Sequence, residues 1–466
     1  MVSISKEMRK QMQKQKVTKK NQDHTMKALL MVAIPIALQN LINVGVSTAD
    51  TLMIGNISEV QLSGISQANL VYFIFTTVLF GLASGSVVLN AQYFGKKEME
   101  PIRTILGFMI RVGIIMGALM GLAVLAFPNQ VMSIFTNEPE VIMYGSKYLR
   151  IIAFSYLFSG FTGVYLMGVR SIQNVRVSMY IYGISLCTNV VLNYILIYGK
   201  LGFPRMEIEG AAIATLICRI LESILVVIYM YKGEKVLKMR LSYIFKKSRQ
   251  YFRSLARYSA PVLLSEVNWG LGIAVQSAII GRMGVSFLAA SSFISVLQQL
   301  AGIIMIGIGV GSSIIIGNLI GEGKEQEAKS LANKLIRVSV VLGGIVAFAV
   351  ILLRPIAPDF IKASKETADL IRQMLFVSAY LLFFQSLSVL TMVGILRGAG
   401  DTLYCATFDV LTLWVLKLGG GLLATAVLHL PPVWVYFILS SDECVKAIFT
   451  IPRVLKGGWI HDTTLH

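Results

Sequence analysis

The chain has 466 residues, of which 55% are apolar and only 14% are charged. A soluble protein cannot bury so large an apolar share, whereas twelve membrane helices of ~20 residues each would use about 240 residues. The composition excludes an ordinary aqueous enzyme, and the net charge of +18 is explained by membrane topology rather than by nucleic-acid binding.

Apolar windows long enough to cross a membrane follow one another along the chain. Residues 1–27 precede them and carry eight Lys or Arg without an apolar run, which indicates a cytoplasmic N-terminal tail rather than a secretory signal. The windows are 28–49, 60–95, 112–137, 151–169, 177–199, 208–231, 255–281, 283–321, 338–353, 373–396, 402–428 and a last helix after Pro431 and Pro432. We therefore predict an all-α polytopic membrane protein with twelve transmembrane helices.

Basic residues are concentrated on one side of this arrangement. When alternate loops are assigned to opposite sides, 31 of the 42 Lys and Arg fall with the termini and the even-numbered loops. Since cytoplasmic loops carry an excess of Lys and Arg, we expect both termini to be cytoplasmic. The expected location of the chain is the cytoplasmic (inner) membrane. Nine of these residues lie between Lys232 and Arg257 and predict a basic cytoplasmic linker.

The chain also repeats itself. A shift of residues 35–95 by 226 positions superposes Pro35 on Pro261 and four glycines on four glycines: Gly55, Gly81, Gly85 and Gly95 on Gly281, Gly307, Gly311 and Gly321. Six spans separate the copies, so both copies have the same orientation, as in transporters built from parallel halves. We predict an N-lobe (28–231), the linker (232–257), a C-lobe (258–450) and a cytoplasmic C-terminal tail (451–466), with six helices in each pseudo-symmetric lobe.

Four stretches carry a resemblance to a known family: "IPIALQNLINVGVSTADTLMIG" (34–55), "AQYFGKKE" (91–98), "GNLIGEGKEQEAK" (317–329) and "GILRGAGDT" (394–402). Their order and spacing resemble the multidrug and toxic compound extrusion (MATE) family over nearly the whole chain. The resemblance implies two six-helix bundles arranged as a V around a central cavity. It also implies the export of organic cations in exchange for Na⁺ or H⁺.

Asp50 is the first candidate site residue, because a carboxylate at membrane depth requires pairing, hydration or a bound ion. It lies fifteen residues after Pro35 on the first helix, with no cation nearby in sequence. One interpretation is a helix-end Asp that is hydrated at the outer interface. The other comes from the resemblance, which aligns this residue with the cation-coupling Asp of NorM-like and DinF-like members. No metal other than Na⁺ at Asp50 is expected.

Glu266 follows Pro261 on the seventh helix and is the candidate for substrate or second-cation binding. In the repeat it aligns with Asn40, which precedes Asp50 by ten residues. At a rise of about 1.5 Å per residue, Glu266 is therefore expected ~15 Å nearer the cytoplasm than Asp50. A structural hydrogen bond to Asn268 or to kinked backbone is the alternative. "LLSEVNWG" resembles the helix 7 Glu of NorM-like members, whereas their helix 10 Asp corresponds here to Ser386.

Asn189 and Asn193 share one face of the fifth helix, since they are spaced i, i+4. Two amides could supply oxygens to Na⁺ or orient a carboxylate, or they could simply hold helices together. The resemblance places partners of the helix 1 Asp here, although DinF-like members carry an acid at the position of Asn193.

Two further pairs of charges lie within the spans. Arg219 and Glu222 are spaced i, i+3 on the sixth helix, and we interpret them as a structural ion pair. Asp409 and Lys417 are too far apart along the eleventh helix for a simple contact, and no role follows for them from the sequence.

The combined prediction is a cation-coupled antiporter that exports amphipathic cationic molecules by alternating access, acts as a monomer and needs no cofactor apart from Na⁺ or H⁺. No GxxxxGK[ST] motif occurs, so ATP is not the expected energy source. The nearest alternative is a flippase for lipid-linked oligosaccharides, which would need a row of cations in the cavity. An intramembrane transferase would need clustered Asp or a His and acid pair at one membrane face, and neither pattern occurs.

Overall fold

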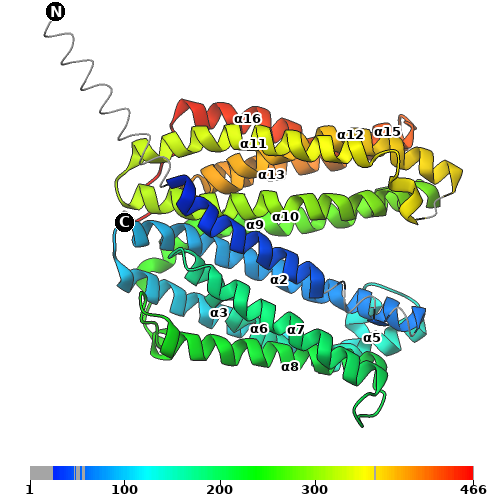
Figure 1. The fold of residues 1–466 in the computed structure, drawn as a ribbon, viewed down its shortest axis with the longest axis horizontal. Helices are drawn as coiled ribbons and strands as arrows, with labels where there is room; N and C mark the ends of the chain where they lie inside the picture. The colour runs from blue at the N-terminus through cyan, green and yellow to red at the C-terminus, as the bar shows by residue number, and fades with distance from the viewer. Residues whose placement is uncertain (1–24, 47, 49–52, 55–57, 362–363, 465–466) are drawn as a thin grey trace, which may run out of the picture. The chain divides into compact units, whose positions relative to one another are not determined.

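The computed structural model describes residues 25–464 except 47, 49–52, 55–57 and 362–363, and helices dominate this part of the chain (Figure 1). In the first half they are the helix Thr25–Val46, α2 (Glu59–Gly95), α3 (Met99–Ala126), α4 (Pro128–Ser133), α5 (Pro139–Ile152), α6 (Ser155–Arg170), α7 (Arg176–Tyr198) and α8 (Glu207–Ile228), followed by the short turns η1 (Tyr229–Gly233) and η2 (Leu241–Phe245).

The second half repeats this order of long helices. It contains α9 (Arg249–Gly281), α10 (Val285–Gly321), α11 (Glu325–Leu353), η3 (Ala357–Ile361), α12 (Lys365–Val389), η4 (Leu390–Leu396), α13 (Thr402–Leu411), η5 (Thr412–Gly419), α14 (Gly420–Ala426), α15 (Pro432–Ser440) and α16 (Asp442–Lys456).

The helices agree with the predicted twelve-span layout. Within the described ranges, ten helices are long and apolar enough to cross a membrane, and α5 with α6, which bend by 57°, bring the number to eleven. The last segment consists of α15 and α16, which meet at Ser441. Neither helix alone is long enough to cross a membrane, since α15 has 9 residues and α16 has 15, and α16 also carries the charges of Asp442, Glu443 and Lys446. The prediction of an all-α polytopic membrane protein is confirmed.

The internal repeat extends to the detailed backbone geometry. Helices α2 and α10 both have 37 residues. After α2, the Lys96 N–H donates to the Gln92 carbonyl at 3.1 Å, and 226 positions later the Glu322 N–H donates to the Asn318 carbonyl at 2.9 Å. The next residue has a left-handed φ in both copies, 62° at Lys97 and 73° at Gly323. The same turn therefore closes the same long helix in each half.

Contacts between residues divide the chain into two compact units. One is Leu38–Leu271, and the other is Gly272–Leu465 together with the chain up to Ala37. The divisions fall inside the helix Thr25–Val46 and inside α9, whereas the predicted lobes, which remain a prediction, divide at the linker. Two predicted boundaries also fall within helices, because α9 already begins at Arg249 and α16 continues to Lys456 before the left-handed Gly457 ends it.

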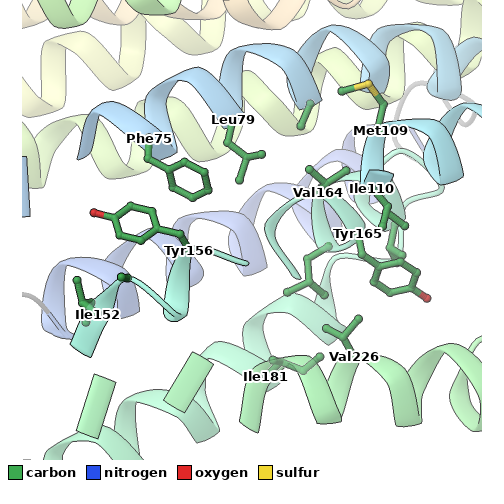
Figure 2. Packing of buried hydrophobic residues seen from close by; sticks show 14 of the residues in the cluster. Phe75, Leu79, Met109, Ile110, Ile152, Tyr156, Val164, Tyr165, Ile181 and Val226 are labelled. Atoms are coloured by element: carbon green, nitrogen blue, oxygen red, sulfur yellow. The ribbon is translucent and has the colours of Figure 1, made fainter. Parts of the chain in front are cut away.

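Each compact unit has its own apolar core. In the Leu38–Leu271 unit, Phe75 of α2 meets Tyr156 of α6 edge to face, with ring centroids 5.0 Å apart (Figure 2). Ile110 of α3 and Val226 of α8 belong to the same cluster. In the other unit, a separate cluster joins α10, α12 and α15. Packing of this kind fixes the helices that carry the polar groups described below.

Glycines allow two equivalent close helix crossings. A Cβ atom added to Gly85 of α2 would lie 2.3 Å from the Ser259 Cα of α9, within the Leu38–Leu271 unit. A Cβ atom added to Gly311 of α10 would lie 3.1 Å from the Ala33 Cα, within the other unit. The shift of 226 residues relates the two contacts to each other, because it superposes Gly85 on Gly311 and Ala33 on Ser259. The matched glycines of the sequence repeat therefore mark a repeated contact, in which the early part of one helix rests against a glycine of another.

Replacing Gly85 with Ala should destabilise the protein by about 1–3 kcal/mol, because the added methyl group overlaps the backbone of α9. Gly302→Ala is the matched control, since a Cβ atom there meets nothing within 4 Å. We expect the control to be neutral or slightly stabilising. Thermal unfolding of the two purified variants in detergent measures the difference, and equal melting temperatures would contradict the close crossing.

Candidate functional site

Asp50 lies outside the described residues, so its predicted role in cation coupling is not tested by the structure. The described chain reaches close to it, where the Thr48 hydroxyl donates to the Val44 carbonyl at 2.8 Å. Its assignment as the coupling residue stays a prediction.

A buried polar face runs along α7. Ser185, Asn189 and Asn193 are spaced by four residues and are 5%, 1% and 0% exposed. The Asn193 amide donates from Nδ2 to Asn189 Oδ1 at 3.1 Å, so the structure brings the two predicted amides together. The Nδ2 of Asn189 has no hydrogen-bond partner among the described residues. A buried donor of this kind suits a carboxylate more than a cation.

An ion pair on α8 continues this polar face. The Arg219 guanidinium donates from Nη1 to both carboxylate oxygens of Glu222, at 2.8 and 2.9 Å. The Ser185 hydroxyl of α7 donates to the same carboxylate at 2.6 Å, and Glu222 is 1% exposed. Arg219 also lies over the Tyr72 ring, 5.6 Å from its centroid. The pair predicted from the i, i+3 spacing is therefore present and is connected through Ser185 to the helix that carries the amides.

A second buried cation lies in the same compact unit. Arg170, at the end of α6, is 8% exposed and donates from Nη2 to the Gln39 side-chain oxygen at 2.6 Å. An amide partner does not neutralise the charge. The sequence pattern alone does not indicate this contact, because Gln39 is 131 residues away in the chain.

Glu266 and Ser386 lie in different compact units. Glu266 on α9 is half-buried, and its Cβ is 3.4 Å from the point where Gly81 of α2 would carry one. Ser386 on α12 is fully buried, and its hydroxyl donates to the Ser339 carbonyl of α11 at 2.9 Å. The Ser386 hydroxyl thus joins α12 to α11, whereas Glu266 lies against α2 near Gly81.

The Gly272–Leu465 unit contains a charge network that joins α13, η5 and α16. Lys446 of α16 lies 3.3 Å from Asp409, 3.2 Å from Asp442 and 3.2 Å from Glu443. Lys417 lies 3.7 Å from Asp442. Asp409 and Lys417, for which the sequence offered no role, are therefore linked through α16. Three carboxylates share two ammonium groups in this network.

The described residues hold no group of three or more His, Cys, Asp or Glu arranged to bind a metal ion. Because residues 49–52 are not among them, this observation does not bear on a Na⁺ ion at Asp50.

Comparison with known proteins identifies the family. The model of the MatE family matches residues 35–195 and 261–423, well over half of the chain. The two matches begin 226 positions apart, which equals the shift of the internal repeat. The chain belongs to the MatE family, as the four sequence stretches predicted.

Named relatives and solved structures agree with this assignment. The probable multidrug resistance protein NorM of Thermotoga maritima is 22% identical over 444 residues and 93% of each chain. The corresponding protein of Pasteurella multocida is 24% identical over 454 residues, which cover 92% of this chain and 94% of the relative. A MOP superfamily transporter from Pyrococcus furiosus has a TM-score of 0.83 at 16% identity, covering 93% of this chain and 96% of that one. Similarity at this level of identity establishes the fold.

Replacing Arg219 with Met should destabilise the protein by about 3–5 kcal/mol, because it leaves the Glu222 carboxylate buried without its partner. Arg205→Met is the matched control, since Arg205 pairs with Glu207 at 3.1 Å in an exposed position and should change stability by less than about 1 kcal/mol. Thermal unfolding in detergent compares them. The double variant Arg219→Met/Glu222→Leu should recover part of the loss, and no recovery would contradict the pairing.

Replacing Lys446 with Met should destabilise the protein more than Lys417→Met does. Lys446 contacts three carboxylates, whereas Lys417 contacts one. Both changes remove one ammonium group, so they differ mainly in the number of carboxylates that lose an ammonium partner. Melting temperatures of the two variants decide the order, and an equal or smaller loss for Lys446→Met would be inconsistent with its central position.

Proposed function

We propose that the chain is an antiporter that exports organic cations or drugs across the cytoplasmic membrane in exchange for Na⁺ or H⁺, with Asp50 as the coupling residue. Family membership and the names of the relatives support drug export. The observation that carries the choice of site is the buried polar face of α7, where Asn189 keeps a donor without a described partner. Buried polar groups at membrane depth are costly, and a donor without a described partner supports a binding role over a purely structural contact between helices.

In the proposed mechanism, one negative group binds two kinds of cation in turn. An incoming Na⁺ or H⁺ neutralises Asp50 in the outward-open form, which weakens the attraction for a cationic substrate and favours its release. The Asn189 and Asn193 amides orient the carboxylate or coordinate the ion. Each charge that moves through 100 mV supplies ~2.3 kcal/mol, which is enough to bias the cycle.

Alternating access follows from the parallel repeat, since transporters of this type rock two halves about a central site. Glu266 of α9, which lies against α2 near Gly81, is assigned to substrate or second-cation binding in this scheme. Ser386 stands where NorM-like members carry the helix 10 Asp, and its hydroxyl donates a hydrogen bond to the Ser339 carbonyl of α11. A second cation site would therefore depend on Glu266 rather than on Ser386. The substrates are amphipathic cations, and the monomer in the bilayer is the transporting unit.

The flippase alternative gains no support from the two cations that the sequence centres in spans, although Arg170 is a further buried cation, whose described partner is the Gln39 amide. A binding surface for anionic lipid-linked sugars needs several cations that lack carboxylate partners. The two cations centred in spans, Arg219 and Lys417, each pair with a buried carboxylate, at 2.8 Å with Glu222 and at 3.7 Å with Asp442. An intramembrane transferase has no support from the relatives, which are named as resistance proteins or transporters.

Ethidium efflux from cells that make the Asp50→Asn variant tests the proposal. The variant keeps the size of the side chain and removes its charge, so we expect gradient-driven efflux to fall to the level of cells without the protein. Glu59→Gln is a control, since Glu59 begins α2 and has no role in the scheme. Undiminished, ion-dependent efflux by Asp50→Asn at equal protein level would contradict the assignment of this residue.

A further inference from the structure

Between α8 and α9 the chain forms a cavity of about 600 Å³ that is lined almost entirely by cationic and aromatic side chains. Its lining residues are Arg103, Lys238, Arg240, Ser242, Tyr243, Phe245 and Lys246. All of them belong to the Leu38–Leu271 unit. The basic linker predicted from the sequence thus borders an open, concave basic surface, although an excess of basic residues requires no such surface.

The linker is fixed in place by its own buried residues. The Glu234 carboxylate accepts hydrogen bonds from the backbone N–H groups of Val236 at 2.7 Å and Leu237 at 2.6 Å. Leu237 and Met239 are buried, at 0% and 1% exposed, whereas the intervening Lys238 and the following Arg240 are exposed. This alternation directs both cations outward from an anchored segment.

The other wall of the cavity comes from α3. A Cβ atom at Gly107 would lie 2.3 Å from the Tyr243 carbonyl, so this glycine allows η2 to pack directly on α3. One turn earlier, Arg103 donates from Nε to the Leu237 carbonyl and lies over the Tyr243 ring. The cavity is therefore built by close packing between a membrane helix and the linker.

The charge of the cavity is not balanced. Glu100 pairs with Arg103 at 3.1 Å and with Lys246, and it accepts a hydrogen bond from the Tyr243 hydroxyl at 3.1 Å. Hydrogen bonding to Glu100 raises the pKa of Lys246, which keeps that ammonium charged. Lys238 and Arg240 form no ion pair with the described residues.

An apolar surface adjoins this unbalanced charge. Phe245, which lines the cavity, is 80% exposed. Aromatic side chains of this kind are typical of the interface between membrane and water, and basic pockets beside membrane helices bind anionic headgroups. A soluble anion would make no use of the exposed ring.

We propose that this cavity binds the phosphate headgroup of an anionic phospholipid, with Lys238 and Arg240 as the main ligands and Phe245 against the acyl chains. The site is independent of the proposed transport cycle, since it is built by the linker and α3 and involves none of the residues assigned to coupling. It gives the basic linker a binding role in addition to the part in membrane orientation that the sequence predicts.

A lipid titration tests the site. Purified protein in a neutral detergent is titrated with short-chain phosphatidylglycerol, with the phosphatidylcholine of the same chain length, and with glycerol phosphate, and the melting temperature is recorded. We expect a saturable rise with phosphatidylglycerol alone. In the Lys238→Gln/Arg240→Gln variant, the apparent affinity should fall about tenfold or more, since each basic residue near an anionic headgroup contributes substantially.

Two further variants separate the interpretations. Lys324→Gln/Lys334→Gln removes the same charge outside the cavity and should bind phosphatidylglycerol as the wild type does. Phe245→Ser keeps every cation but should weaken lipid binding. Unchanged binding by Lys238→Gln/Arg240→Gln, or unchanged binding by Phe245→Ser, would overturn the proposal. So would an equal response to glycerol phosphate, because the site would then be one for small anions.

Discussion

The structure is governed by the high free energy of an unpaired charge at membrane depth. Twelve apolar segments can carry ionisable side chains only if each one meets a counter-charge, an amide or water. Glu222 meets Arg219 and Ser185, and Lys446 meets three carboxylates. Each of these groups is positioned by a helix whose packing is fixed by apolar cores and by close crossings at glycine. The pairing of the buried charges therefore depends on the packing of the helices that carry them.

The internal repeat gives the two halves of the chain the same backbone geometry. A shift of 226 residues relates the matched glycines, the turn after α2 and the turn after α10, and the two matches to the MatE family. The polar contents of the halves are nevertheless different. The first half has an amide pair and an ion pair on α7 and α8, whereas the second half has a network on α13, η5 and α16. The two halves therefore share backbone geometry but differ in their buried polar side chains.

The sequence was sufficient for the fold, because apolar windows, basic loops and repeated glycines are each direct consequences of the membrane environment. It was also sufficient for contacts within one helix, such as Arg219 with Glu222 and Asn189 with Asn193. It could not predict contacts that depend on how distant helices pack. Asp409 and Lys417 seemed unrelated until α16 placed Lys446 and Asp442 beside them. Arg170 with Gln39 and the cavity of the linker belong to the same class, since their parts come from distant segments.

The central claim is that the carboxylate of Asp50 alternates between a coupling ion and a cationic substrate. Uptake of a fluorescent cation into proteoliposomes, driven by an imposed Na⁺ gradient or an imposed pH gradient one at a time, tests it most directly. The account predicts that one gradient drives uptake by the wild-type protein and that neither drives uptake by Asp50→Asn. Uptake by the wild type that needs neither gradient, or uptake by Asp50→Asn that still follows one of them, would contradict it.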